Sequence, residues 1–205
     1  MSTEMRTNCY LPFLEINLTP ARLQHSIGVM HVMTELAEIY SLDRTQALTA
    51  GLLHDAAKDL EPEQQLALIE EAGVELRHPC ERHPVYLHAT ASACLISKEF
   101  SITDRLLLDA ISTHSYSGDG PNFNSHLTQC LRSADILAPS HVWLGMRKLK
   151  SVVYAGRLEE AALLQVAWLI EYFHEINIPI HPNLTRSFQE ATTRLAIGDD
   201  FFDRW

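Results

Sequence analysis

The sequence predicts an all-α fold of about eight to nine helices. Apolar residues recur at spacings of three and four along most of the chain, and helix start and stop signals separate these segments. No segment shows the strict alternation of a strand, and there is no internal repeat. Of the 205 residues, we expect a single domain at 19–198, preceded by an N-terminal extension, 1–18, and followed by a tail, 199–205.

Helix signals are clear in the first third of the chain. Thr19 is expected to cap a helix that has Pro20 at its first position. Asp43 and Gln46 have the spacing of a capping box, which predicts a second helix running through His54. A short third helix is expected in "EPEQQLALIEEAG", between the proline near its start and the glycine at its end.

Six further helices are expected in the rest of the chain. Pro84 and Thr103 are expected to start two of them, and the Gly-, Asn- and Ser-rich segment 115–124 is the clearest loop. A helix then ends at Pro139. The last three are expected at about 140–155, 158–176 and 185–197.

The composition favours a globular protein that acts on a small molecule. The chain is 46% hydrophobic and 20% charged, and 16 Lys and Arg against 26 Asp and Glu give a formal net charge of −10. This charge disfavours nucleic acid and anionic membranes as partners, so an anionic substrate would need local cations or a metal ion. The longest apolar stretch, 161–170, is too short to span a bilayer and predicts a buried helix.

The cysteine pattern predicts a cytoplasmic protein. The four cysteines are widely spaced and form no CxxC pair; they are Cys9, Cys80, Cys94 and Cys130. The first 20 residues lack the apolar core of a signal peptide. We therefore expect reduced, structural thiols.

Polar residues recur on the apolar faces of successive predicted helices. They are His25, the pair His54 and Asp55, His88, His114 and Asp135. One histidine on an apolar face is usually an ordinary core residue. Burying all of these without partners would cost several kcal/mol in total, whereas a metal would satisfy them together.

The types of ligand restrict the metal and the chemistry. Imidazoles mixed with carboxylates suit Fe, Mn, Zn, Co or Ni. Four histidines and two aspartates suffice for two metals if one carboxylate bridges, and Asp55 is the central candidate. Two metals a few Å apart would stabilise the attacking and leaving oxygens of a displacement at phosphorus.

The order His…His-Asp…His…His…Asp resembles the HD superfamily of metal-dependent phosphohydrolases, which are helical bundles. Within it, "RLQHSIGV", "AGLLHDAAKDL", "LHATASACLI", "AISTHSYSG" and "SADILAP" resemble the YqeK family of symmetrical bis(5′-nucleosyl)-tetraphosphatases. The resemblance covers about residues 20–186. It implies an HD-domain bundle that splits diadenosine tetraphosphate into two ADP.

The resemblance also implies roles for individual residues. One metal would be held by His25, His54, Asp55 and Asp135, and the second by His88 and His114 with Asp55 shared. Iron is the expected metal, with Mn, Co, Ni or Zn as alternatives. Asp55 and Lys58 would act in catalysis. The nucleotide would contact Lys58, Ser115, His141, Arg147, His181 and Asn183.

One segment departs from the family pattern. Where the family has "EPxR" after its last aspartate, this chain has Ala138 and His141 in place of the acid and the arginine. Histidine binds phosphate only weakly near neutral pH, and Arg147 could substitute. Two alternatives therefore stay open, a nucleotidase acting on (deoxy)nucleoside monophosphates and a regulatory nucleotide-binding module with little turnover. A homodimer is also open.

Overall fold

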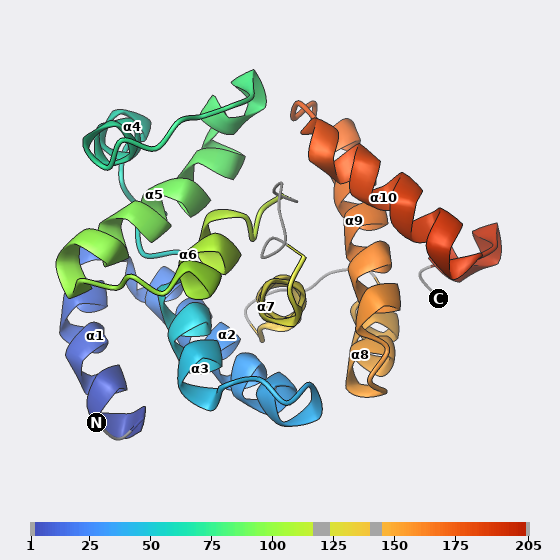
Figure 1. Ribbon diagram of the computed structural model, residues 1–205, viewed down its shortest axis with the longest axis horizontal. Coiled ribbons are helices and arrows are strands. Elements are labelled where there is room, and N and C mark those ends of the chain that lie inside the picture. Colours follow the sequence, from blue (N-terminus) through green and yellow to red (C-terminus); the bar gives the residue numbers. More distant parts are fainter. Residues whose placement is uncertain (1–2, 117–123, 140–144, 204–205) are drawn as a thin grey trace.

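The computed structural model describes residues 3–116, 124–139 and 145–203. Within these residues the chain forms ten α-helices, two short 3₁₀ helices and no strand, which confirms the all-α prediction (Figure 1). The α-helices are α1 (Thr3–Asn17), α2 (Pro20–Ile39), α3 (Arg44–Leu53), α4 (Pro62–Glu71), α5 (Pro84–Phe100), α6 (Arg105–Ser112), α7 (His126–Leu137), α8 (Met146–Tyr154), α9 (Leu158–Glu175) and α10 (Pro182–Leu195). The 3₁₀ helices are η1 (Pro79–Arg82) and η2 (Asp199–Phe202).

The nine helices expected from the sequence are all present, and α1 is the tenth. It lies in the segment expected as an extension, and its Leu14 is buried in the main core. Phe100, at the end of α5, packs edge-on against Tyr10 and Phe13, with ring centroids 4.7 and 5.1 Å apart. α1 therefore covers one face of the bundle.

Helix starts follow the cap residues in most cases. Thr19 precedes Pro20 at the start of α2, and the Asp43 carboxylate accepts from the Gln46 backbone N–H at 2.7 Å. The expected cap at Thr103 was wrong by one residue. The Asp104 carboxylate accepts from the Leu107 N–H instead, because a helix needs a side-chain acceptor at its first free amides.

The HD pair does not lie within a helix, contrary to the sequence prediction. α3 ends at Leu53. In the turns that follow, backbone N–H groups donate to the carbonyl three residues earlier, Ala56 N–H to Leu53 O at 3.2 Å and Lys58 N–H to Asp55 O at 2.9 Å. Such bonds wind the chain more tightly than an α-helix. Lys58 is therefore carried by this turn and not by α3.

Close packing of α2 against α3 sets the position of that turn. A Cβ added to Gly51 would lie 2.7 Å from Met30 Cα and 2.9 Å from Met30 N, so only glycine permits this approach. α7 packs against both helices. The ends of α3 and α7 thus converge beside α2.

The C-terminal helices form a second layer over this bundle. α9 lies against α7, and α10 lies alongside α9 (Figure 1). A smaller apolar cluster joins this layer to α5; its buried members are Tyr86, Tyr116, Val166, Phe173 and Leu184. α10 begins three residues before the sequence prediction because His181 caps it and Pro182 takes its first position.

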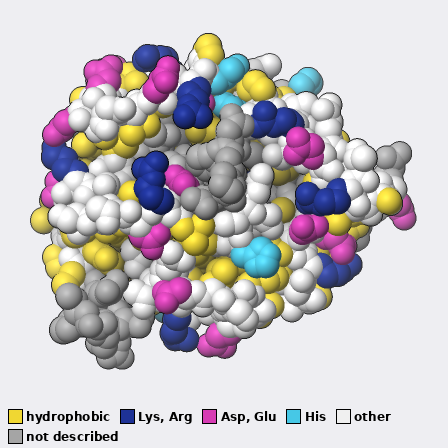
Figure 2. Space-filling model, in the orientation of Figure 1, with side chains coloured by type: hydrophobic (Ala, Val, Ile, Leu, Met, Phe, Trp, Pro, Cys, Tyr) yellow, Lys and Arg dark blue, Asp and Glu magenta, His cyan; other side chains and the backbone are white. Residues whose placement is uncertain are grey.

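The surface is mixed in charge. Acidic and basic side chains are interspersed over the face drawn in Figure 2. Among the described residues, no helix is long and apolar enough to cross a bilayer.

Candidate metal centre and adjoining cavity

Side chains from five separate segments meet in one centre. They are the six predicted ligands: His25 on α2, His54 and Asp55 in the turn after α3, His88 on α5, His114 after α6 and Asp135 on α7. His25 Nε2 lies 3.0 Å from Asp135 Oδ1. His88 Nε2 and His114 Nε2 lie 3.2 and 3.5 Å from Asp55 Oδ1. Residues up to 110 positions apart in the chain, Asp135 and His25, are thus in direct contact.

Backbone carbonyls orient three of the imidazoles. The Nδ1 atoms lie close to the carbonyl of a residue three or four positions earlier: His54 to Gly51 at 2.8 Å, His88 to Pro84 at 3.0 Å and His114 to Ile111 at 2.7 Å. Because a carbonyl oxygen only accepts, each Nδ1 carries the proton. Each Nε2 then presents its lone pair to the centre, as in metal-binding histidines.

The ligand atoms form overlapping groups. Three sets have their atoms within 4.8 Å of one another: His25, His54 and Asp55; His54, His114 and Asp135; and Asp55, His88 and His114. His54 Nε2 and Asp55 Oδ1 are buried, and neither has a hydrogen-bond partner among the described residues. Because buried polar atoms are normally paired, these two atoms fit a bound divalent cation.

The charges in the centre favour the protonation states that bind metal. Burial alone would raise the pKa of Asp55, but the neighbouring Lys58 ammonium holds it well below its usual range. Burial also opposes ionisation of Asp135, and the hydrogen bond from His25 outweighs it and lowers that pKa. Burial and the Lys58 charge lower the pKa of His88 to about 4. Ionised carboxylates and neutral imidazoles are the forms that bind metal.

Two cations lie beside the carboxylates. Lys58 Nζ lies 2.9 Å from His88 Nε2. Arg22 Nη1 lies 3.8 Å from Asp55 Oδ2, and its Nε lies 3.6 Å from Asp59 Oδ1. The sequence analysis did not identify Arg22, although it lies three residues before His25 and so on the same face of α2. These cations offset the net negative charge locally.

A cavity of about 520 Å³ opens onto the centre, a size typical of small-molecule sites. Lys58 and Ser115, both predicted to contact nucleotide, line it. Its far wall is apolar and comes from α9 and α10, with Leu169, Phe173 and Leu184. The cavity therefore joins a polar, metal-binding end to an apolar end.

Arg132 lines the same cavity and was also missed, although it lies three residues before Asp135 on α7. Its Nη2 donates to the Thr113 carbonyl at 2.9 Å and to the Tyr116 carbonyl. Burial lowers its pKa to about 10, which leaves the guanidinium charged at neutral pH. Arg132 thus holds the backbone on either side of His114.

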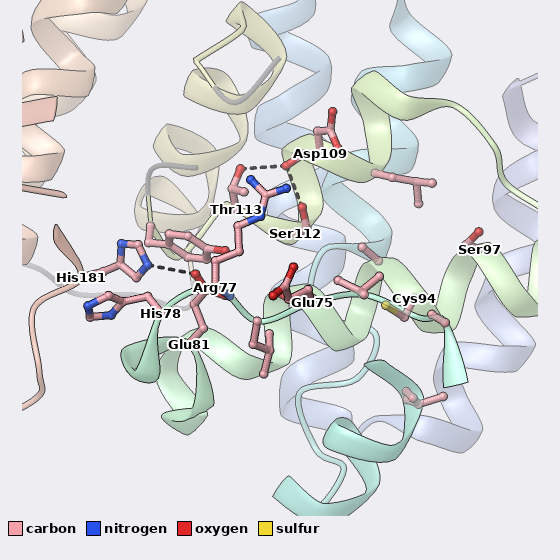
Figure 3. A pocket seen from close by; sticks show the side chains of 18 of the residues that line it. Glu75, Arg77, His78, Glu81, Cys94, Ser97, Asp109, Ser112, Thr113 and His181 are labelled. Atoms are coloured by element: carbon pink, nitrogen blue, oxygen red, sulfur yellow. Dashed lines mark hydrogen bonds and ion pairs between the residues drawn. The ribbon is translucent and has the colours of Figure 1, made fainter. Parts of the chain in front are cut away.

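His181 and Asn183 line a second cavity, of about 930 Å³, that shares Tyr116 with the first (Figure 3). His181 Nε2 donates to Glu81 Oε1 at 3.2 Å, and its Nδ1 accepts from the Asn183 N–H at 3.1 Å. Figure 3 shows His78 beside His181, and their ring centroids lie 5.1 Å apart. His181 and Asn183 therefore form the start of α10, on the other side of Tyr116 from the metal centre.

The two other predicted nucleotide contacts are Arg147 and His141. Arg147 is exposed on α8 and lines neither cavity. His141 falls in 140–144, outside the described residues.

A helical bundle whose interior gathers four imidazoles and two carboxylates beside a ligand-sized cavity defines a metal-dependent hydrolase. The model of the HD domain family matches residues 22–140, the segment that contains all six of these side chains. The chain belongs to the HD domain family and is a phosphohydrolase.

Relatives match most of the chain. The symmetrical bis(5′-nucleosyl)-tetraphosphatase of Bacillus subtilis (strain 168) is 26% identical over 166 residues, 81% of this chain and 87% of the relative. The protein of the same name from Halalkalibacterium halodurans is 28% identical over 180 residues, 88% of this chain and 94% of the relative. A solved structure from Clostridium acetobutylicum, described as a predicted HD superfamily hydrolase involved in NAD metabolism, has a TM-score of 0.83 and 29% identity, and covers 92% of this chain and 97% of that one.

Proposed function

We propose that this enzyme hydrolyses dinucleoside tetraphosphates symmetrically, cutting diadenosine tetraphosphate into two ADP. The observation that carries the proposal is the position of Asp55. It belongs to two of the three ligand groups, so one carboxylate can be shared between two divalent ions. The full-length relatives named for this reaction support the choice of substrate.

Two of the three ligand groups support an assignment of residues to each ion. His25, His54, Asp55 and Asp135 would hold one ion, and His88 and His114 with Asp55 would hold the second. Iron is the metal we propose, because mixed imidazole and carboxylate ligands suit it; Mn, Co, Ni and Zn suit the same ligands. When bound, such ions supply Lewis-acid charge and lower the pKa of water toward neutrality.

The protein's own side chains orient and neutralise the polyphosphate. Lys58 lies beside His88, and Arg22 lies beside Asp55, so a phosphate at the centre would meet a cation on two sides. These contacts strengthen as charge builds on the phosphoryl oxygens. Asp55 would orient the attacking water, and a carboxylate oxygen of Asp55 that is not occupied by an ion would accept its proton.

The reaction balances with water as the only co-substrate. The water oxygen forms a bond to the second or third phosphorus. The bond from that phosphorus to the oxygen that bridges the two phosphorus atoms breaks. The bridging oxygen leaves with the other ADP. Because ADP is a stable anion, the departing group needs no strong general acid.

Product analysis tests the proposal. Protein purified with its metal is incubated with diadenosine tetraphosphate in ¹⁸O water. The nucleotides are then separated, and their masses are measured by mass spectrometry. We expect ADP as the sole product, with one ¹⁸O for every two ADP. Formation of AMP and ATP would contradict symmetrical cleavage. Turnover confined to nucleoside monophosphates or to NAD would contradict dinucleoside tetraphosphates as the substrate class.

A further inference from the structure

Gln165 is a single polar residue within the apolar run 161–170 on α9. It is 3% exposed and lines the 520 Å³ cavity. Leu169 and Tyr172, which follow it by four and seven residues, line the same cavity, so one stripe of α9 forms this wall. The amide is therefore placed in the apolar end of the cavity.

The orientation of the amide follows from its neighbours on α7. The Ser133 hydroxyl donates to the Gln129 carbonyl at 2.9 Å. Since its one proton is used there, the Ser133 oxygen can only accept from Gln165, and the Gln165 Nε2 lies 2.5 Å away. The amide nitrogen must face Ser133, which leaves Oε1 as a free acceptor.

That acceptor has no hydrogen-bond partner among the described residues, although it is buried. Val166, Leu169 and Phe173 of the same helix are apolar residues that also line the cavity. An unpaired buried carbonyl of this kind destabilises a folded protein. A ligand that brings an N–H group into this cavity would supply the hydrogen-bond donor that the Gln165 Oε1 lacks.

The cavity wall at Gln165 is linked to the metal centre through α7. Gln165 contacts Ser133 of this helix, and Asp135 and Ile136 of the same helix also line the cavity. A molecule with its phosphates at the metals would therefore extend its other end along α7 toward Gln165. A flat heterocycle with an N–H donor on its edge matches the apolar walls and the free acceptor.

We infer that the Gln165 Oε1 accepts a hydrogen bond from the exocyclic amino group of the nucleobase and makes the enzyme select 6-aminopurine nucleotides. The inference rests on the proposed nucleotide substrate and adds its base specificity. Ser133 is the positioning residue, because it holds the amide in the accepting orientation. The apolar wall supplies affinity without distinguishing bases, and the Gln165 acceptor supplies the discrimination.

Binding calorimetry with the metal-loaded protein tests the inference without turnover. The probes are ADP and the diphosphate of purine riboside, which lacks only the 6-amino group. We expect wild type to bind ADP roughly tenfold or more tightly than the analogue, because the analogue leaves the buried acceptor unpaired. Gln165→Leu should bind both probes with the same Kd. Gln189→Leu, an exposed glutamine on α10, is the matched control and should keep the wild-type ratio.

Equal affinities in the wild type would overturn the inference, and this comparison depends on no variant. A wild-type ratio retained by Gln165→Leu, or no binding of ADP at millimolar concentration, would overturn it as well. Turnover separates the two proposals. Protein that cleaves the adenosine and purine-riboside tetraphosphates equally well keeps the proposed function and loses the role of Gln165. Protein that binds ADP more tightly than the analogue but forms products other than ADP keeps the role of Gln165 and loses the proposed function.

Discussion

The ammonium of Lys58 lies 2.9 Å from His88 Nε2, the ring nitrogen that faces the metal centre, and 3.1 Å from Nδ1 of the same ring. His88 Nδ1 donates to the Pro84 carbonyl, so Nε2 carries the lone pair and accepts from Lys58. A metal ion and an ammonium cannot share one lone pair. Lys58 therefore has to leave Nε2 when an ion binds there, and its ammonium, which also interacts with the Asp55 carboxylate, is then free to contact a substrate phosphate.

Replacing Lys58 separates phosphate binding from metal binding. We expect Lys58→Ala to retain its metal, because the imidazole ligands are undisturbed, and to lose roughly 10²-fold in kcat/KM. Metal content by mass spectrometry and initial rates with diadenosine tetraphosphate measure both effects. Lys98→Ala removes an exposed lysine paired with Glu71 and should match wild type. A Lys58→Ala enzyme with full activity would contradict a role for this cation.

Replacing Asp55 should remove metal and turnover together. Asp55→Asn keeps the size of the side chain but removes the charge shared by two ligand groups. We expect less than half of the wild-type metal and no measurable hydrolysis above background. Asp59→Asn, in the same turn, is the control: Asp59 accepts from the Thr19 N–H and hydroxyl and belongs to none of these ligand groups, so metal content should persist. Full metal occupancy in Asp55→Asn would refute the shared carboxylate.

The buried thiols make a prediction about pH. Burial raises the pKa of Cys130 to about 12 and that of Cys94 to about 11, so neither is a thiolate at pH 8 in the folded protein. We expect a thiol reagent at pH 8 to modify the exposed Cys9 rapidly and these two only after unfolding in urea. Mass spectrometry of tryptic peptides locates the label. Labelling of Cys130 as fast as Cys9 would show that α7 is not packed as described.

Stability should fall at alkaline pH for the same reason. Above pH 9, the ordinary thiol value, the unfolded chain loses these protons while the folded chain keeps them until about pH 11 to 12. The folded state then binds more protons, so the free energy of unfolding decreases as pH rises through this window. The double variant Cys94→Ala/Cys130→Ala should show a shallower decrease in urea titrations at pH 9 to 11.

The sequence was sufficient to predict the six residues that meet in the candidate metal centre, but not the cations that lie beside them. Histidines and aspartates on apolar helix faces are conspicuous because burial makes an unpaired polar group unfavourable. Arg22 and Arg132 resemble ordinary helix-surface residues until the fold turns them toward Asp55 and the Tyr116 carbonyl. Their spacing of three residues from His25 and Asp135 places them on the same helix faces, but it does not show which distant groups they contact.

Helix positions show the same limit. Caps such as Asp43 are local hydrogen bonds and were predictable from spacing. The end of α3 before His54 was not, because it depends on packing: Ala57 N–H donates to Ser92 of α5 at 3.0 Å rather than continuing a helix. Gln165 was taken only as part of a buried helix, since its significance comes from Ser133 on another helix.

Gly51 links the stability of the bundle to the metal centre, and its replacement should damage both. In Gly51→Ala the new methyl carbon would lie 2.7 Å from Met30 Cα, and backbone cannot yield as a side chain does. We expect a loss of about 1–3 kcal/mol in the free energy of unfolding, seen as a fall in Tm of about 2–4 °C for each kcal/mol. Because the Gly51 carbonyl orients His54, metal affinity should fall too.

Gly28→Ala is the comparison for this substitution. Its Cβ would meet Pro139 Cδ at 3.1 Å, a side-chain contact that a shift of a few tenths of an ångström relieves. We therefore expect a smaller loss of Tm and unchanged metal content in Gly28→Ala. Thermal unfolding of both variants, with and without added metal, measures the difference. If Gly51→Ala has the same Tm as wild type and keeps its metal, α2 and α3 do not approach each other as closely as the structure shows.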